Sequence, residues 1–491
     1  MMDKPAPETP PEKPTADATP ELENDLTNTQ KGRWERSWPT IACGAGLFSD
    51  GYLNNVIGSV NTVLRKLYPD TYTTSSAVKN VPSIAFAGTV VGQLVFGYYS
   101  DHYSRKWSLM VATVILIVFA ALCTGSYGGG TPHGIFTALT VYRFFLGIGI
   151  GGEYPAGSVA AAESTGELKK GHRNRWFIMF TNFQIDFGFV VAAIVPMIVV
   201  LIFTENHLRA SWRVMLGLGV IPPLSLLYLR LKLEEPEEFN RERMHKYPVW
   251  LIVKFYWKRL SIVALIWFIY NFSVYAFGIY SSAWLQLVLS EDAPLWKSFG
   301  WNTVVNLFYI PGSFAGAFVS DWIGPRYALA VGVFSQGIIG FIMSGCYKFL
   351  ATAQNVAAFV VVYGIFLSLG ELGPGDNIGL IASKSSATAV RGQYYGIAAA
   401  CGKIGAFIGT YVFPIIQENA PNPIRAGQDP FFVASSLCIF SAGLAVFALP
   451  HIGQDTITTE DARFRQYLQD NGYDTSTMGS KERREVAEES A

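Results

Sequence analysis

Long runs of apolar residues, separated by short polar breaks, make up most of the chain between about residue 39 and residue 450. Each run reaches or exceeds the roughly 20 residues that an α-helix needs to cross a bilayer. Because lipid offers no partner for backbone N–H and C=O groups, such spans must be helices. The pattern predicts twelve transmembrane helices, at about 39–64, 80–100, 107–127, 135–161, 176–203, 212–231, 260–289, 301–321, 327–346, 355–382, 392–418 and 430–450.

Three polar segments frame these runs and divide them. The charged segment 232–259 separates the sixth predicted helix from the seventh, so we expect an N-terminal six-helix bundle over 39–231, a linker, and a C-terminal six-helix bundle over 260–450. Residues 1–38 are rich in Pro, Thr and Glu and lack an apolar core, which predicts a disordered tail and not a cleavable signal peptide. Residues 451–491 form a second polar tail, in which we expect at most a short helix.

Composition and charge agree with a membrane protein and indicate its orientation. Charged residues make up 15% of the chain, against roughly a quarter in a soluble protein. Most of the 37 Lys and Arg residues fall on the side that holds both tails and the linker, so both termini are predicted to be cytoplasmic. The 37 acidic residues balance them, which argues against a nucleic-acid partner. The five cysteines are scattered singly and the six histidines fall in predicted loops, so we expect no disulfide framework, metal or cofactor.

The two predicted halves resemble each other. "GQLVFGYYSD" (92–101) ends the second helix and "GSFAGAFVSD" (312–321) ends the eighth, while "GGEYPAG" (151–157) is echoed by "GELGPG" (370–375). Repeats broken by Gly and Pro at corresponding positions are typical of transporters whose site lies between the halves. The glycines at 147, 149 and 152 also satisfy the dinucleotide fingerprint, but no βαβ unit surrounds them.

These stretches carry a family resemblance. "GYYSDHYSRK" (97–106) resembles the loop motif of the major facilitator superfamily, and "RFFLGIGIGGEYPAGSVAAAES" (143–164) is similar to the fourth-helix signature of proton-coupled phosphate symporters. "ELGPGDNIGLIASKSSATAVRGQYYGIAAACGKIGAFIGT" (371–410) resembles fungal glycerophosphodiester permeases, which import glycerophosphoinositol or glycerophosphocholine. The resemblance implies an all-α membrane protein with the major facilitator fold, a monomer in the plasma membrane. It also implies proton-coupled import of a small anionic phosphodiester by alternating access.

Two buried cations bear on the substrate class. A charge at mid-membrane costs about 2.5–3.5 kcal/mol on insertion scales, so Arg143 and Lys403 are candidates for function. An anionic phosphodiester would compensate for their burial through charge-assisted hydrogen bonds. In the resembled phosphate symporters, the residues matching Lys403, Tyr154 and Gln184 face the binding cavity. The alternatives are an ion pair of Lys403 with a carboxylate of helix one or ten, and a structural network around Arg143.

Three intramembrane carboxylates, Asp50, Glu153 and Asp186, are the predicted proton carriers. A carboxylate in a low-dielectric cavity binds a proton more readily than one in water. The glycines around Glu153 allow close helix approach and Pro155 loosens the backbone, so we expect Glu153 to face the central cavity. The alternative is that Glu153 pairs with Lys403 or Arg143 and never titrates. The resembled symporters usually have Asp at the position of Glu153.

The seventh helix places Trp267, Asn271 and Tyr275 on one face by their i, i+4 and i+8 spacing, which predicts that they line the cavity. The resembled phosphate symporters have Asp where Asn271 stands, and an amide carries no proton. The head group of the diester stays open. Choline would favour aromatic or acidic residues, offered by Tyr270, Tyr275, Tyr280 and Trp284. Inositol would favour amides and hydroxyls, offered by Gln184, Asn271 and Asn377.

The repeated loop motif predicts a gate. We expect a charged latch that closes the cytoplasmic side, with solvated surface charge as the alternative; its members are Asp101, Arg105, Asp321 and Arg326. The nearest rival function is an inorganic phosphate:proton symporter, against which Asn271 and the helix-ten pattern count. A non-transporting nutrient sensor would be expected to carry a long signalling extension. A membrane enzyme is disfavoured because no His lies within the predicted spans.

Overall fold

The computed structural model describes residues 41, 43–164, 171–233, 235, 237–244, 246–289, 293–453 and 456–479. The predicted tail of residues 1–38 lies outside them, as do residues 480–491 of the second tail. Every regular element within the described ranges is a helix. The predicted all-α class is therefore confirmed.

The first half of the chain forms one helical body. Its long helices are α3 (Leu47–Leu67), α5 (Ala77–His102), α6 (Arg105–Thr124), α7 (Pro132–Gly152) continued by the π-helical turn η2 (Glu153–Ser158) and α8 (Val159–Ser164), α9 (Arg173–Phe180) continued by α10 (Asn182–Phe203), and α11 (Leu208–Gly217) continued by η5 (Leu218–Val220) and α12 (Ile221–Leu231). Short connections are α4 (Pro69–Tyr72), η1 (Gly128–Gly130) and η4 (Glu205–His207).

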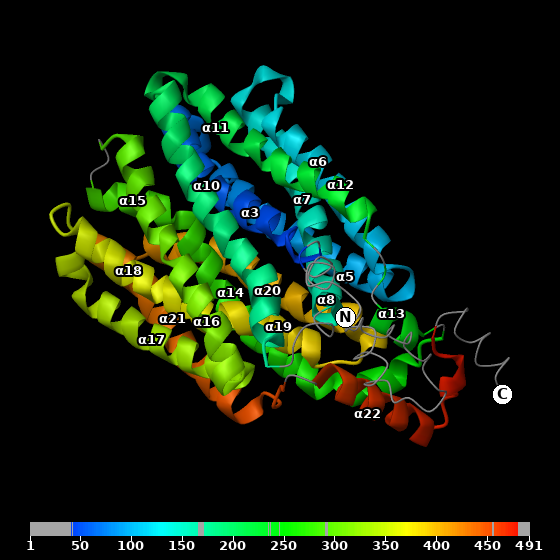
Figure 1. Cartoon of the computed structure of the whole chain (residues 1–491). Coiled ribbons are helices and arrows are strands. Elements are labelled where there is room, and N and C mark those ends of the chain that lie inside the picture. The colour runs from blue at the N-terminus through cyan, green and yellow to red at the C-terminus, as the bar shows by residue number, and fades with distance from the viewer. Residues whose placement is uncertain are drawn as a thin grey trace, which may run out of the picture.

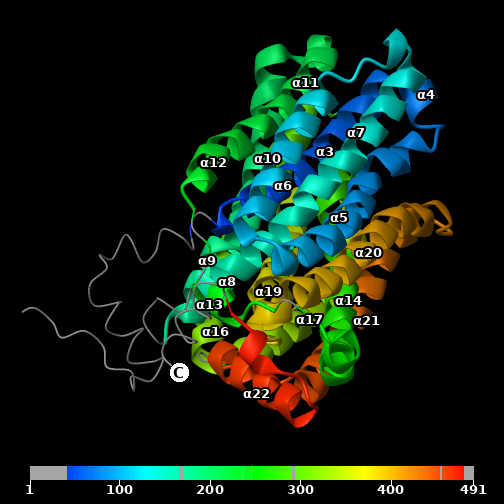
Figure 2. The same cartoon turned by 90° about the vertical axis from the view of Figure 1, so that its right-hand side faces the viewer.

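The second half forms another body beside the first (Figure 1). Its long helices are α14 (Val249–Leu289), α15 (Leu295–Leu307) continued by α16 (Tyr309–Ile323), α17 (Pro325–Leu350), α18 (Val356–Gly370) continued by the π-helical turn η6 (Glu371–Gly375) and α19 (Asp376–Lys384), η7 (Thr388–Val390) continued by α20 (Arg391–Glu418), and α21 (Pro423–Ala448). The linker helix α13 (Glu237–Glu242) and, after the last span, α22 (Thr456–Asp470) and η8 (Thr475–Thr477) lie together at one end of the molecule (Figure 2). This end is called the linker end below.

Eleven helices in the described residues are long and apolar enough to cross a membrane, and they correspond to the second to twelfth predicted spans. The first predicted span corresponds to α3, a helix of 21 residues. Buried polar residues of α3, among them Asp50, Asn54 and Asn61, lower its hydropathy. They face other helices, so α3 lies inside the protein as one of twelve long helical segments.

The seventh helix begins earlier than the sequence predicts. We placed its start at residue 260, after a linker over 232–259, but α14 already begins at Val249. The cationic run that suggested a linker does not end the helix, because Phe255 and Tyr256 pack against Phe464 of α22. The tail helix itself is longer than the short helix we expected, with 15 residues. Packing outside the bilayer therefore extends two elements that hydropathy alone cannot place.

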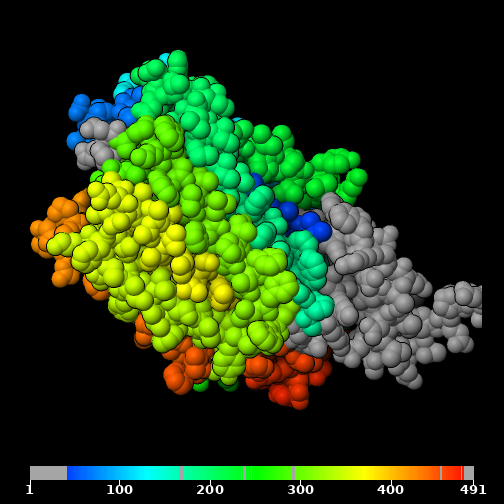
Figure 3. All heavy atoms as spheres, turned by 60° about the vertical axis from the view of Figure 1, so that its left-hand side comes forward, coloured from blue at the N-terminus to red at the C-terminus, as the bar shows by residue number. Residues whose placement is uncertain are grey.

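The halves are in contact on both sides of the molecule's centre. Near the linker end α5 packs on α20, where a Cβ on Gly396 would lie 2.5 Å from the carbonyl oxygen of Gln93. At the opposite end Asn55 donates to Asn306 Oδ1 at 2.8 Å, and the Thr62 and Ser282 hydroxyls are 3.1 Å apart. In the space-filling view, helices of the first half (teal) adjoin those of the second (green and yellow) along one face (Figure 3). A central space is enclosed between these contacts.

Candidate functional site

A cavity of about 760 Å³, including the part continuous with solvent, lies between the two halves. The first half contributes residues of α3, η2, α9 and α10, and the second contributes residues of α14, α16, η6, α19 and α20. The wall is rich in aromatic rings: Tyr154, Phe177, Phe189, Trp267, Tyr270, Tyr275, Tyr309 and Tyr395. A space of this size accommodates a small organic molecule.

Lys403 of α20 lies directly behind one part of this wall. It is fully buried, its Nζ donates to the Tyr275 hydroxyl at 2.5 Å, and it lies 3.6 Å from Asp50 Oδ2. Its ammonium also faces the rings of Tyr154 and Tyr275, 4.7 Å and 4.1 Å from their centroids. The alternative stated above, an ion pair with a helix-one carboxylate, is therefore present. The cation nevertheless lies one side chain away from the cavity.

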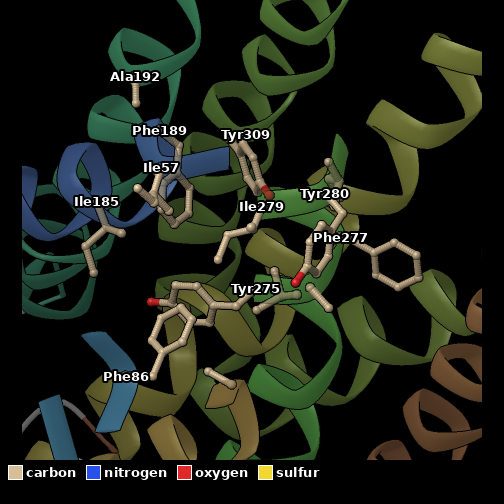
Figure 4. Packing of buried hydrophobic residues seen from close by; sticks show 14 of the residues in the cluster. Ile57, Phe86, Ile185, Phe189, Ala192, Tyr275, Phe277, Ile279, Tyr280 and Tyr309 are labelled. Atoms are coloured by element: carbon tan, nitrogen blue, oxygen red, sulfur yellow. The ribbon is translucent and has the colours of Figure 1, made fainter. Parts of the chain in front are cut away.

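Asp50 is held by several donors. The Tyr154 hydroxyl and the Asn54 amide both donate to its carboxylate, in addition to Lys403. Tyr154 and Asn54 line the cavity. Figure 4 shows the Tyr275 ring pointing from α14 toward Phe86 of the first half, with Phe277 on the other side of that helix. Asp50 and Lys403 thus connect the two halves behind a tyrosine wall.

A second polar cluster contains three carboxyl groups, Asp186 of α10, Glu371 at the start of η6 and Asp376 at the start of α19. We call it the carboxyl trio. The Asn182 amide donates to all three, at 3.2, 3.0 and 2.9 Å respectively. In addition the Tyr270 hydroxyl donates to Glu371 at 2.8 Å. All three carboxyl groups are at most 3% exposed and line the cavity.

No lysine or arginine in the described part of the chain forms an ion pair with the trio. Asp186 and Glu371 are close enough to hydrogen-bond to each other. Two ionised carboxylates do not hold that contact without a proton or another cation between them. The trio is therefore a buried site that needs positive charge.

Glu153 does not lie where the sequence suggested. Its two carboxylate oxygens each accept a hydrogen bond of 2.6 Å from the Arg230 guanidinium of α12. Arg230 also donates to Thr113 of α6. The expectation that Glu153 faces the central cavity is wrong, and so is the alternative pairing with Lys403 or Arg143. Sequence spacing could not reveal Arg230 as the partner, because it lies 77 residues away and was placed at a helix end.

Three further predicted cavity residues lie elsewhere. Arg143 is buried near the end opposite the linker end and donates to the carbonyl oxygens of Val81 and Leu53 at 2.9 and 3.3 Å. Gln184 donates to the Met179 carbonyl oxygen. Asn377 accepts from Ser320 and donates to the Gly373 carbonyl oxygen. None of the three lines the cavity, since each side chain is engaged with neighbouring helices or its own backbone. Trp267, Asn271 and Tyr275 do line it.

At the linker end, Asp101 and Arg105 belong to a buried network that joins the halves. Arg105 pairs with Asp101 at 2.5 Å and with Glu163 at 3.1 Å, and Glu163 pairs with Arg391 of α20 at 3.1 Å. Asp101 also accepts from the backbone N–H groups of Gly392 and Gln393, at 2.8 and 2.7 Å. The surface-charge alternative fails for this pair, because both side chains are fully buried.

The repeat-related pair in the second half is arranged differently. Asp321 pairs with Arg175 of α9 at 3.4 Å, and both side chains are partly exposed. Arg326 donates to the Val446 carbonyl oxygen. Of the expected latch residues, Asp321 therefore contacts Arg175 of the other half and Arg326 contacts a backbone carbonyl oxygen.

Several residues of these sites escaped sequence reasoning. They are Asn182 and Tyr309 at the cavity, Arg230 beside Glu153, and Glu163 and Arg391 at the linker end. Glu163 lies just beyond the predicted fourth helix, which ends at about residue 161. Had the helix been continued to its observed end at Ser164, a second acidic residue on that segment would have required a partner.

Comparison with known proteins places the chain among transporters. The family model described as "Sugar (and other) transporter" matches residues 38–246 and 237–462. The Major glycerophosphoinositol permease of Candida albicans is 56% identical over 92% of this chain and 86% of its own length. The Glycerophosphocholine permease of the same organism is 52% identical over 93% of this chain and 87% of its own length.

A solved structure supports the fold. The proton:xylose symporter of the major facilitator superfamily, bound to 6-bromo-6-deoxy-D-glucose, superposes with a TM-score of 0.74 at 16% identity, over 87% of this chain and 98% of that chain. At this identity the likeness concerns the fold alone. It confirms the predicted arrangement of two six-helix halves.

Proposed function

Because the chain belongs to the family of sugar and other transporters in the major facilitator superfamily, we propose that it carries glycerophosphodiesters across the membrane together with protons. The protein is a multi-pass membrane transporter and not an enzyme. The relatives named above are permeases for two such diesters and are identical to this chain at more than half of the aligned residues. We assign a substrate of the same class, a glycerophosphodiester, to the cavity between the halves.

One observation supports an anionic substrate most directly: a lysine beside the cavity, behind the rings of Tyr154 and Tyr275. Lys403 is held by Asp50 and by the Tyr275 hydroxyl. A phosphodiester oxygen that enters between Tyr154 and Tyr275 competes with Asp50 for this ammonium. A charge-assisted hydrogen bond of this kind contributes about 1.5–3 kcal/mol. A neutral sugar offers no such exchange.

The same exchange gives a route for proton coupling. When the phosphodiester draws Lys403 away, Asp50 is left buried with only Tyr154 and Asn54 as donors. An uncompensated buried carboxylate takes up a proton. Substrate and proton are then carried together, and release of the diester returns Lys403 to Asp50 and expels the proton. Asp186, as a member of the carboxyl trio, is the second proposed proton carrier, while Glu153 is held by Arg230.

We assign the linker end to the cytoplasm and the protein to the plasma membrane, acting as a monomer. The excess of Lys and Arg on the side of the linker and both tails supports this orientation. Import of a monoanion against an inside-negative potential opposes about 2.3 kcal/mol per charge per 100 mV. One co-transported proton removes that opposition, and a second makes the potential a driving force.

The proposal is tested by uptake of radiolabelled glycerophosphoinositol, glycerophosphocholine and inorganic phosphate into cells that lack their own carriers, with and without a protonophore. We expect uptake of at least one diester, abolished by the protonophore. Asp429→Asn, a change at an exposed pair with Arg425, serves as a matched acid-to-amide control that keeps uptake. Uptake of phosphate alone would overturn the diester assignment, and diester uptake indifferent to the protonophore would overturn the coupling.

A further inference from the structure

The cavity has two chemically different ends. Lys403 and Asp50 lie behind Tyr275, and the carboxyl trio lies around Tyr270, on the same helix α14. Five residues of helix correspond to about 7.5 Å of rise. A phosphodiester and the head group esterified to it are long enough to reach both ends. The proposed function places the phosphate at Lys403, so the head group faces the trio.

The trio contains unsatisfied oxygen atoms, and glycines leave space beside its carboxyl groups. Asp186 Oδ1 and Asp376 Oδ2 are buried and accept no hydrogen bond from any described donor. Glycines leave room for two of the carboxyl groups: a Cβ on Gly316 would lie 2.1 Å from Asp376 Oδ2, and one on Gly375 would lie 1.9 Å from Glu371 Oε2. Unsatisfied acceptor oxygens buried beside a cavity favour a ligand that brings positive charge or a hydrogen-bond donor.

The surroundings of the trio favour a cation over a polyol. Tyr270 contacts Glu371, and Tyr309 and Phe189 from the two halves pack on each other at a centroid distance of 5.2 Å beside the same cavity. Aromatic faces combined with carboxylates are the setting in which proteins bind quaternary ammonium groups. A quaternary ammonium needs no hydrogen-bond donor from the protein, and few donors in this part of the wall are unoccupied.

Most of the amides that a polyol would need are occupied or absent from the wall. The Asn182 amide nitrogen already donates to the three carboxyl groups. Gln184 and Asn377 hydrogen-bond to backbone carbonyl oxygens away from the cavity. Of the three amides that the sequence offered to inositol, Asn271 alone lines the wall.

We propose that Asp186, Glu371 and Asp376, with Tyr270, form a head-group subsite that selects diesters bearing a positively charged head group of the choline class. This inference rests on the proposed function, since it needs the phosphate at Lys403. The two relatives named above are permeases for an inositol and a choline diester at nearly equal identity, so they do not decide the head group. The trio joins Asp186 of one half to Glu371 and Asp376 of the other, so a bound cation draws the two halves together.

The test is competition in the protonophore-sensitive uptake assay. In the wild type, unlabelled glycerophosphocholine should inhibit labelled diester uptake at a concentration at least about 10-fold lower than glycerophosphoinositol does. Asp376→Asn should raise the half-saturating concentration of glycerophosphocholine about 10-fold and leave that of glycerophosphoinositol or its inhibitory potency within twofold. Asp429→Asn controls for an acid-to-amide change outside the cavity.

Each other outcome overturns the inference. Preference of the wild type for the inositol diester would remove the choline class. Equal loss of uptake of both diesters in Asp376→Asn would make the trio a proton site without head-group selectivity. If Asp376→Asn reaches the cell surface and its half-saturating concentration of glycerophosphocholine is unchanged, the trio takes no part in binding. Absence of any diester uptake in the wild type is a different result, because it defeats the proposed function itself.

Discussion

Two glutamates occupy the same position in the two halves and have opposite surroundings. Glu153 begins the π-helical turn η2 and Glu371 begins the π-helical turn η6, each after a glycine and shortly before a proline. Arg230 neutralises Glu153 with two hydrogen bonds of 2.6 Å. Glu371 meets Tyr270, Asn182 and two further carboxyl groups. Repeated backbone geometry therefore does not imply a repeated role, because the partner contributed by a distant helix decides it.

The difference in surroundings indicates that Glu153 contributes to stability and Glu371 to transport. A buried ion pair with ideal geometry holds η2, α6 and α12 together, and breaking it leaves an isolated buried charge. A group without a cation is free to exchange a proton or bind a ligand. We therefore assign Glu153 to the framework of the first half and Glu371 to the working surface of the cavity.

The largest effect should come from removing Arg230. Arg230→Met leaves Glu153 buried without its cation and should destabilise the protein by about 3–5 kcal/mol. Thermal unfolding of the detergent-purified protein, followed by intrinsic tryptophan fluorescence, measures the loss. The double variant Arg230→Met with Glu153→Gln should recover most of it, since no lone charge remains. A single variant as stable as the wild type would show that the pair is not structural.

Removal of the cation beside the cavity should affect transport next most strongly. Lys403→Ala should lower uptake of every diester about 10- to 100-fold, through the loss of one charge-assisted hydrogen bond to the phosphate. Because Asp50 then loses its partner, Lys403→Ala combined with Asp50→Asn separates misfolding from lost binding. Restored surface expression without restored uptake is the expected result. Uptake restored by the double variant would remove Lys403 from the binding site.

The loop motifs offer a second repeat-related comparison. Asp101 is fully buried and joins Arg105 to two backbone N–H groups of α20, whereas Asp321 forms a longer and partly exposed contact with Arg175. Asp101→Asn should therefore lower the maximal uptake rate about 10-fold, and Asp321→Asn less than about threefold. Uptake kinetics over a range of substrate concentrations check both, with the half-saturating concentration little changed. Equal effects would contradict the asymmetry.

Asp461 of α22 is a buried acid outside the membrane. It is intermediate between Glu153, which has a close cation, and Glu371, which has none among the described residues. Burial raises the pKa of Asp461 to about 6, while Arg391 at 3.9 Å and hydrogen bonds from Thr388 act in the opposite direction. The docked tail helix α22 thus binds a proton more tightly than the undocked helix. Its docking weakens as pH rises from about 4 to about 6, and acidification from pH 7 to pH 5 should strengthen it by about 1 kcal/mol.

Hydrogen exchange of α22 amides at the two pH values, corrected for intrinsic rates, measures this change in lipid nanodiscs. Asp461→Asn should abolish the pH dependence, because the amide does not titrate. Protection that increases toward pH 7 in the wild type would contradict the sign.

The sequence predicted the architecture more fully than the site. Hydropathy and the repeated motifs were enough for twelve helices in two halves, because the bilayer constrains length and composition. The face of α14 that holds Trp267, Asn271 and Tyr275 was also predictable from helical spacing. These features depend on residues close together in the chain.

Partners across the structure were not predictable. Glu153 pairs with Arg230 and Glu163 pairs with Arg391. Asp186 lies beside Glu371 and Asp376. In each case the partners are more than 70 residues apart in the sequence. Hydropathy ranks Glu153 and Glu371 as equal intramembrane charges. Only the three-dimensional neighbours distinguish an ion pair from a site that lacks positive charge.

The most direct test of this distinction compares Glu153→Gln with Glu371→Gln, each purified and reconstituted in the same lipid. Unfolding temperature and glycerophosphocholine uptake would be measured on the same preparations. We predict that Glu371→Gln keeps or raises the unfolding temperature, since Gln still accepts from Tyr270, and loses at least about 10-fold of uptake. Glu153→Gln should lower the unfolding temperature. A Glu371→Gln variant that unfolds at a lower temperature than Glu153→Gln, or that transports as the wild type does, would contradict the assignment of Glu371 to the cavity and Glu153 to the framework.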